Sequence, residues 1–238
     1  MTTAVLADLD DTLFDHAHAT RHALKALQAA ERTLAEWPID DLFHHHNLIL
    51  DTMHPRVLAR ELTVDEARLV RFARLLRDAG ADESEARAVQ AAAIYRHAYE
   101  QGWRAVPGAT QLLDRLRAEG CRIVVVTNNG VVEQRLKLDR CDLIGRIDAL
   151  VTSEEVGTPK PGKAIFDAAL AQAGAAASGA VMVGDAWHTD VEGARQSGIR
   201  AVWYNPRGLA SPDPNVAEIR ALAPADDALM ALLAVPAR

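Results

Sequence analysis

Residues 4–13, AVLADLDDTL, carry the clearest structural signal in the chain. Four apolar residues are followed at once by carboxylates at positions 8, 10 and 11. A short apolar run without polar alternation is typical of a strand buried on both faces, as in a parallel sheet. Carboxylates placed directly after such a strand lie at its carboxyl end, where open α/β sheets bind their ligands. The stretch therefore predicts a parallel strand that ends in a polar site.

The same pattern recurs in the second half of the chain. Short apolar runs lie at 123–126, 149–151, 181–183 and 201–204. Segments of helical periodicity, at about 109–120 and 163–174, lie between them. Strands that alternate with helices predict an α/β fold with a Rossmann-like, doubly wound parallel sheet. The polar residues that end these strands are expected at one edge of that sheet.

A long interval separates the first strand from the helix that follows Pro107-Gly108. It spans roughly ninety residues, whereas one strand–helix–strand unit needs only about thirty. We therefore expect an all-helical cap domain at 17–102, inserted into an α/β core formed by 1–16 and 103–238. An insert near the polar end of a sheet is typical of a lid.

Four helices are expected within this interval. Pro38 is expected to end the first, and the second should run from about residue 40 to 54, before Pro55. Thr63 with Glu66 has capping-box spacing and predicts the start of a third helix, which continues to Gly80. Asp82 with Glu85 predicts the start of a fourth, which continues to Gly102.

Composition narrows the class of protein. The chain has 238 residues, of which 49% are hydrophobic and 25% charged, as in ordinary globular proteins. A net charge of -7 argues against a nucleic-acid polymer as partner, because binding to its phosphate backbone needs a basic surface. The two cysteines form no zinc or disulfide pattern. Because the start of the chain lacks a secretory signal and no apolar run is long enough to span a bilayer, we expect a cytoplasmic protein without a membrane partner.

The chemistry-bearing residues follow the predicted strands. Asp8 and Asp10, two positions apart, leave their strand toward the same side. One could act as a nucleophile while the other transfers a proton, although an isolated pair of this kind is more often a solvated acidic turn. Thr127-Asn128 could bind a phosphate oxygen, and Lys160 stands on a stiff segment between two prolines.

Asp185 and Asp190 add two more carboxylates after a later strand. A third carboxylate at the same sheet edge completes an oxygen-rich shell suited to Mg²⁺. Each of these residues alone also fits a plain structural role, such as a turn, a surface lysine or a helix N-cap. Their joint occurrence at successive strand ends is what points to a site.

Four segments in this order resemble the motifs of the haloacid dehalogenase (HAD) superfamily. They are DLDDTL at 8–13, Thr127-Asn128, Lys160-Pro161 with Ile165-Phe166 downstream, and Gly184-Asp185 through Asp190. The chain resembles a HAD hydrolase with a helical, C1-type cap inserted after the first strand. The resemblance covers the whole core and leaves the cap as the divergent part.

The resemblance implies roles for the three aspartates at strand ends. Asp8 would attack phosphorus and form an aspartyl-phosphate. Asp10 would protonate the departing alcohol and later deprotonate the hydrolytic water. The cofactor Mg²⁺ would be bound by the side chains of Asp8 and Asp185 and by the backbone carbonyl of Asp10.

The remaining motif residues are implied to hold the phosphate and to support the loops. Thr127 and the Asn128 backbone would bind phosphate oxygens, and Lys160 would neutralise phosphate and nucleophile. Asp190 would orient Lys160 or a metal-bound water. Thr12 would support the geometry of its loop.

Asp10 also indicates which HAD reaction to expect. By resemblance, dehalogenases carry a tyrosine at this position, and phosphonate hydrolases carry a small residue and recruit a cap lysine, of which the cap has Lys25. Asp10 therefore favours hydrolysis of a phosphomonoester. A phosphomutase would use the same two aspartates and stays open. A phosphate-binding regulatory protein is a further alternative from another functional class.

The expected substrate is a small phosphorylated metabolite. Segments 157–170, 184–199 and 203–208 resemble the subgroup of pyrimidine 5′-nucleotidases, flavin-mononucleotide phosphatases and acylneuraminate-9-phosphatases. They favour a nucleoside monophosphate or similar ester, with phosphoglycolate and sugar phosphates as close alternatives. Monomer and homodimer are equally open.

Several histidines and aromatic residues have no assigned role. The candidates in the cap are His16, His18, His22, His44–His46, His54, Phe43, Phe72, Tyr95 and Tyr99. Consecutive histidines cannot all face one site on a helix, so an exposed surface is expected for them. Aromatic residues at helical spacing are expected to form the core of the cap. Trp187 and His188 could meet a leaving group, or Trp187 could pack beneath its loop.

Overall fold

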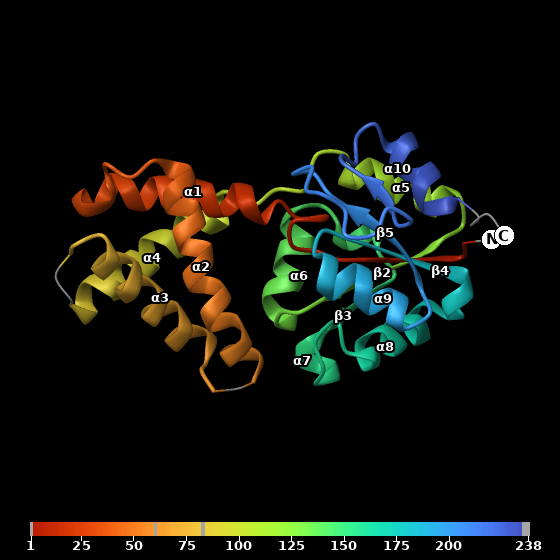
Figure 1. Ribbon diagram of the computed structural model, residues 1–238, viewed down its shortest axis with the longest axis horizontal. Helices are drawn as coiled ribbons and strands as arrows, with labels where there is room; N and C mark the ends of the chain where they lie inside the picture. Colours follow the sequence, from red (N-terminus) through yellow and green to blue (C-terminus); the bar gives the residue numbers. More distant parts are fainter. Residues whose placement is uncertain (1, 60, 82–83, 235–238) are drawn as a thin grey trace. The chain divides into compact units, whose positions relative to one another are not determined.

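The computed structural model describes residues 2–59, 61–81 and 84–234, and the side chain of His54 also lies outside this description. The chain forms two compact units (Figure 1). One is an α/β unit, Met1–Asp15 with Arg104–Arg238, and the other is a helical unit, His16–Trp103. The helical unit begins and ends one residue outside the expected range of 17–102.

The α/β unit is built on a parallel sheet of six strands in the order β3-β2-β1-β4-β5-β6. The strands are β1 (Ala4–Ala7), β2 (Arg122–Thr127), β3 (Ala149–Thr152), β4 (Ala180–Gly184), β5 (Arg200–Tyr204) and β6 (Ala217–Ile219). The predicted doubly wound parallel sheet is confirmed. The sequence did not indicate β6, because its three residues, AEI, are too few to show a pattern.

The strand register aligns the three strand ends that carry the motifs. Ala7, the last residue of β1, pairs with Val125 of β2 and with Val183 of β4. The segments that follow these central strands therefore leave the sheet at the same level. This alignment explains how residues more than one hundred positions apart in the sequence reach one site.

Helices cover both faces of the sheet (Figure 1). On one face, α5 (Ala109–Ala118) packs with α10 (Ala225–Leu233); on the other lie α8 (Lys163–Ala173) and α9 (Gly193–Gln196). Two further helices follow strands directly, α6 (Val131–Arg140) after β2 and α7 (Ser153–Val156) after β3. Buried side chains such as Leu6, Val124 and Phe166 form the core between the sheet and α8.

The helical unit consists of α1 (His16–Ala30), a 3-10 turn at Arg32–Leu34, α2 (Ile39–Leu58), α3 (Val64–Asp78) and α4 (Glu85–Gln101). The predicted capping box of α3 is confirmed, since the Thr63 side chain accepts from the Glu66 amide and Glu66 Oε2 accepts from the Thr63 amide. Among the described residues, no helix combines the length and apolar character that crossing a bilayer requires.

Three predicted helix limits in this unit are wrong. The first helix ends at Ala30 rather than at Pro38, because Glu31 has an extended backbone and its carboxylate is paired with Arg87. α2 continues through Pro55, where the missing donor falls in the last turn and the helix still closes through the Ala59 amide on the Pro55 carbonyl. The cap of α4 is Ser84, whose hydroxyl accepts from the Arg87 amide; Asp82 lies outside the described residues.

The core of the helical unit is aromatic. The rings of Phe72 and Tyr95 have centroids 4.9 Å apart, and Tyr95 stacks on Tyr99 at 5.8 Å. These three side chains are buried, which confirms them as core. His46 is buried with them, so the expectation of an exposed surface is wrong for this histidine, whose position in α2 points inward. His44 is exposed, and His45 is paired with Asp78.

Candidate active site

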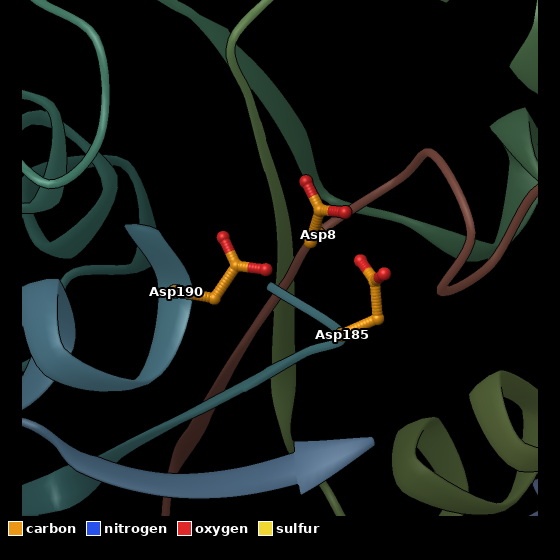
Figure 2. A group of neighbouring side chains, drawn as sticks. All are labelled: Asp8, Asp185 and Asp190. Carbon is orange, nitrogen blue, oxygen red and sulfur yellow. The ribbon is translucent and has the colours of Figure 1, made fainter. Parts of the chain in front are cut away.

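Three carboxylates converge at the carboxyl edge of the sheet (Figure 2). Asp8 follows β1, Asp185 follows β4, and Asp190 lies in the π-helical turn Trp187–Glu192. One oxygen of each lies within 4.8 Å of the other two. Asp8 and Asp190 are buried and Asp185 is half-buried. Oxygen ligands in this number and spacing suit a hard divalent cation such as Mg²⁺.

Gly184 allows Asp190 to reach this group. A Cβ atom at position 184 would lie 2.3 Å from Asp190 Oδ2, so a side chain here would displace the carboxylate. Asp190 Oδ2 also accepts from the Ala186 amide at 3.1 Å, which fixes the turn between the two aspartates. The glycine and the spacing of the predicted motif thus have a direct steric cause.

Trp187 packs beneath this turn. Its ring meets that of Trp203 edge-on at 5.1 Å, and its Nε1 donates to Glu192 Oε1 at 3.1 Å. His188 is exposed and also pairs with Glu192. Of the two expectations for Trp187, the structure favours packing.

Lys160 lies within the carboxylate group. Its Nζ is 2.5 Å from Asp8 Oδ1 and 2.8 Å from Asp190 Oδ1, and it donates to the Val126 carbonyl at 2.8 Å. All three ammonium hydrogens therefore have acceptors. The Asn128 amide holds the lysine backbone, accepting from Lys160 N at 2.6 Å and donating to Lys160 O at 2.9 Å. Asn128 thus fixes the segment that presents Lys160.

The electrostatics of the group favour an added cation. Burial raises the pKa of Asp8 to about 7, helped by Asp190 and opposed by Lys160. Burial and the neighbouring Asp8 and Asp190 raise the pKa of Asp185 to about 8. Burial alone would lower the pKa of Lys160, but Asp190 and Asp8 outweigh it and raise that pKa. One lysine does not balance three carboxylates, so a divalent cation would stabilise their ionised forms.

Two buried threonines lie at the strand ends. The Thr12 hydroxyl lies 3.4 Å from Asp8 Oδ2 and accepts from the Asp185 amide at 3.1 Å, so it joins the loops after β1 and β4. Thr127 is buried at the end of β2, where its Oγ1 accepts from Gln134 Nε2 at 2.8 Å.

The Asp10 carboxylate lies outside the three-carboxylate group and accepts from Asn129, Gln134 and Lys137. Asn129 Nδ2 lies 2.9 Å and Gln134 Nε2 2.7 Å from its Oδ2, and Lys137 Nζ lies 2.6 Å from its Oδ1. Burial would lower the pKa of Lys137, but Asp10 and Glu133 outweigh it and raise that pKa. The sequence alone does not indicate these donors, of which Gln134 and Lys137 lie in α6. Their signal is weak, since polar residues in a helix that follows a strand are ordinarily solvent-exposed.

Comparison with known proteins places the chain in a family. The family described as haloacid dehalogenase-like hydrolase matches residues 2–198. The chain belongs to this family. The HAD hydrolase predicted from the four motifs is thereby confirmed, and the phosphatases among its relatives support a phosphoric monoester hydrolase.

Two curated relatives span different shares of the chain. The ribulose-1,5-bisphosphate 5-phosphatase of Halopiger xanaduensis is 31% identical over 209 residues, which are 87% of this chain and 86% of that protein. The pyrimidine 5′-nucleotidase YjjG of Escherichia coli is 39% identical over 109 residues, 45% of this chain and 48% of that protein.

Solved structures share the fold. The magnesium-bound HAD hydrolase YfnB of Bacillus subtilis superposes with a TM-score of 0.75 at 24% identity, covering 96% of this chain and 98% of that one. A 2-haloacid dehalogenase of Pseudomonas syringae is 32% identical with a TM-score of 0.61, covering 96% and 98%.

Proposed function

We propose that this HAD hydrolase is a Mg²⁺-dependent phosphatase that hydrolyses a small phosphomonoester through an aspartyl-phosphate. The observation that carries the proposal is the buried group in which Asp8 lies against Lys160 and beside Asp185. It joins a nucleophile, a fixed cation and a set of oxygen ligands at one point. Asp8, Asp185 and the Asp10 backbone carbonyl would hold Mg²⁺, which when bound lets an anionic nucleophile approach an anionic phosphate.

The two chemical steps follow from the two aspartates of the first loop. An Asp8 carboxylate oxygen forms a bond to phosphorus while the bond from phosphorus to the ester oxygen breaks, and Asp10 gives a proton to the departing alcohol. Water then forms a bond to phosphorus and gives a proton to Asp10, and the bond to the Asp8 oxygen breaks. Inorganic phosphate and an unchanged Asp8 result.

The surrounding side chains orient these steps. Lys160 and Thr12 contact different oxygens of Asp8, so the carboxylate is fixed from both sides. Thr127 and the Asn128 backbone would bind phosphate oxygens at the end of β2. Asp190 holds Lys160 against Asp8. The helical unit would act as the cap, and a cytoplasmic location stays a prediction that cell fractionation would test.

Asp10 favours phosphate-ester hydrolysis over dehalogenation. Displacing halide from carbon requires no proton donor to the leaving group, whereas an alkoxide leaving from phosphorus does. Asp10 offers a carboxyl group at this position, which in its protonated form would donate to the leaving oxygen. The likeness to a haloacid dehalogenase structure therefore supports the fold and not that reaction.

Two substrate classes remain in the proposal. The subgroup resemblance and the pyrimidine 5′-nucleotidase favour a nucleoside monophosphate. A sugar phosphate is the second candidate, because the ribulose-bisphosphate phosphatase matches over 87% of the chain rather than 45%. Phosphoglycolate belongs with this second class as a small acidic ester.

Phosphate release from a substrate panel tests the proposal. Nucleoside monophosphates, flavin mononucleotide, phosphoglycolate and sugar phosphates are assayed with and without Mg²⁺. Asp8→Asn should lower kcat by at least about a thousandfold, as removal of a nucleophile does. The matched control is Asp167→Asn, an exposed aspartate of α8.

Each outcome of this assay has a definite meaning. Metal-dependent release that Asp8→Asn abolishes supports the proposal, and the ranking of substrates separates the two classes. Substantial release by Asp8→Asn contradicts the nucleophile assignment. Phosphate transfer between two positions of a sugar phosphate, without release, would indicate a mutase. Phosphate binding without any turnover would indicate a regulatory protein.

A further inference from the structure

Helix α6 carries two buried polar side chains that the reaction above does not use. Gln134 is 0% exposed and Lys137 is 3% exposed. They lie three positions apart and so share one face of the helix. Lysine is rarely buried to this extent unless it is paired with an opposite charge. The ammonium of Lys137 is paired most closely with Asp10 and, at a greater distance, with Glu133.

Lys137 is held rigidly where it meets Asp10. Its Nζ lies 2.6 Å from Asp10 Oδ1, 3.6 Å from Glu133 Oε1 and 4.8 Å from the ring centroid of Phe14. The Phe14 ring is itself fully buried, so the ammonium lies between a fixed aromatic face and two carboxylates. A short, charge-assisted bond from a rigid donor restricts the rotation of the Asp10 side chain.

Gln134 connects Asp10 to the predicted phosphate-binding threonine. Its Nε2 donates both hydrogens, one to Asp10 Oδ2 at 2.7 Å and one to Thr127 Oγ1 at 2.8 Å. A threonine hydroxyl has one hydrogen of its own and two acceptor positions. Because Thr127 accepts from Gln134, its own hydrogen is left to donate to a phosphate oxygen.

We propose that Gln134 and Lys137 are positioning residues of the active site. Lys137 orients the Asp10 carboxylate toward the leaving oxygen. Gln134 orients the Thr127 hydroxyl so that it donates to phosphate, and it links Thr127 to Asp10. This inference rests on the proposed phosphatase reaction. α6 then contributes to catalysis through side chains that do not touch substrate.

The two residues predict different kinetic defects. Proton transfer needs a donor within about 2.6–3.2 Å of its acceptor. An Asp10 side chain that has lost its contact with Lys137 should therefore slow the departure of a poor leaving group most. A misaligned Thr127 hydroxyl weakens phosphate binding instead. If the two side chains were purely structural, replacing them would lower the melting temperature and change the turnover of all substrates alike.

The test of Lys137 is a single-turnover assay with enzyme in excess and Mg²⁺ present. Alcohol release is followed from p-nitrophenyl phosphate and from an alkyl phosphate, so that only the first chemical step is measured. Lys137→Met should slow the alkyl ester at least about tenfold more than the nitrophenyl ester, with the half-saturating enzyme concentration changed less than about threefold. Lys163→Met, which removes an exposed lysine paired with an acid four positions away, is the control and should match wild type.

The test of Gln134 is product inhibition. Gln134→Leu should weaken inhibition by inorganic phosphate about tenfold, which Lys137→Met should not do. If methionine at position 137 prevents folding, Lys137→Gln carries the same leaving-group comparison.

The outcomes separate this inference from the proposed function. Equal slowing of both esters by Lys137→Met, or unchanged phosphate inhibition in Gln134→Leu, overturns the positioning roles while wild-type turnover and its loss in Asp8→Asn leave the phosphatase reaction intact. A folded wild-type protein that releases no phosphate from any ester overturns both.

Discussion

Both units bury polar side chains, but they do so in opposite electrostatic settings. In the α/β unit, Asp8 and Asp190 are buried against the ammonium of Lys160. In the helical unit, His46 is buried against the rings of Phe72 and Tyr95, with centroids 6.2 and 5.1 Å away. The first setting gathers several ionisable side chains in contact with one another, whereas the second surrounds one imidazole with aromatic rings.

The pKa shifts express this difference. Burial raises the pKa of Asp8 to about 7 and that of Asp185 to about 8. Burial, with the nearby Arg71 cation, holds the pKa of His46 well below its usual 6.5. His46 Nδ1 meets Asn47 Oδ1 at 3.1 Å, but its Nε2 has no hydrogen-bond partner among the described residues. A neutral, half-satisfied imidazole is a packing element, whereas a buried excess of carboxylates prepares the site for a cation.

The two settings imply opposite responses of stability to pH. In the folded protein the pKa values of Asp8 and Asp185 lie above the ordinary value of 3.8. Without metal, the stability that protonation of these groups contributes is therefore lost as pH rises toward about 7 to 8. His46 resists protonation in the folded protein because its pKa is lowered. The stability that neutral His46 contributes is therefore present above about pH 6.5 and is lost as pH falls below that value. Each prediction that follows alters one side of this contrast.

Lys160→Met should give the largest change in stability. It removes the charge that offsets Asp8 and Asp190 and leaves both carboxylates buried without a cation. The free energy of unfolding without metal should fall by about 3–5 kcal/mol at pH 8, as when one partner of a buried ion pair is removed. The loss should shrink at pH 5, where Asp8 is protonated. Urea unfolding at the two pH values measures both quantities.

The control for this variant is again Lys163→Met. An exposed ion pair contributes less than about 1 kcal/mol, so this variant should unfold close to wild type at both pH values. If the two variants are equally stable at pH 8, the buried group is not charged and the contrast with the helical unit fails.

Added Mg²⁺ should reverse the pH response of the α/β unit. Binding requires ionised carboxylates, so the stabilisation should be small at pH 5 and should grow as pH rises through the raised pKa values of Asp8 and Asp185. At a hundredfold excess over Kd, about 2.7 kcal/mol is expected, or roughly 5–10 °C in melting temperature. Thermal melts from pH 5 to 8 measure it. A shift independent of pH would contradict the assignment of these carboxylates as ligands, and Asp185→Asn should abolish the shift.

The sequence predicted the charged setting better than the neutral one. Asp8, Asp185 and Lys160 follow apolar runs or stand between prolines, and such positions relative to the strands follow from short-range patterns. Parallel pairing then brings them together whatever the side chains between them. The burial of His46 depends on which face of α2 packs against α3 and α4, and three consecutive histidines do not specify that face.

The donors to Asp10 were missed for a related reason. Gln134 and Lys137 lie in a polar helix whose pattern predicts exposure, and only the tertiary position of Asp10 explains their burial. The end of α2 was missed because proline is tolerated in a last turn. Short-range signals therefore identify strand ends and caps, while polar residues buried by a distant partner require the structure.

His46→Leu should give the smallest change and should sharpen the contrast most directly. Leucine has a similar volume and needs no partner, so the free energy of unfolding at pH 8 should stay within about 1.5 kcal/mol of wild type. At pH 5 the variant should be the more stable protein, because wild type gains a proton on unfolding and leucine does not. The measurement is urea unfolding at pH 5, 6, 7 and 8, with His44→Leu, at an exposed position of the same helix, as the control. If wild type and His46→Leu lose stability in parallel below pH 6.5, protonation of His46 does not limit the helical unit in acid, and its burial has no effect on the response to pH.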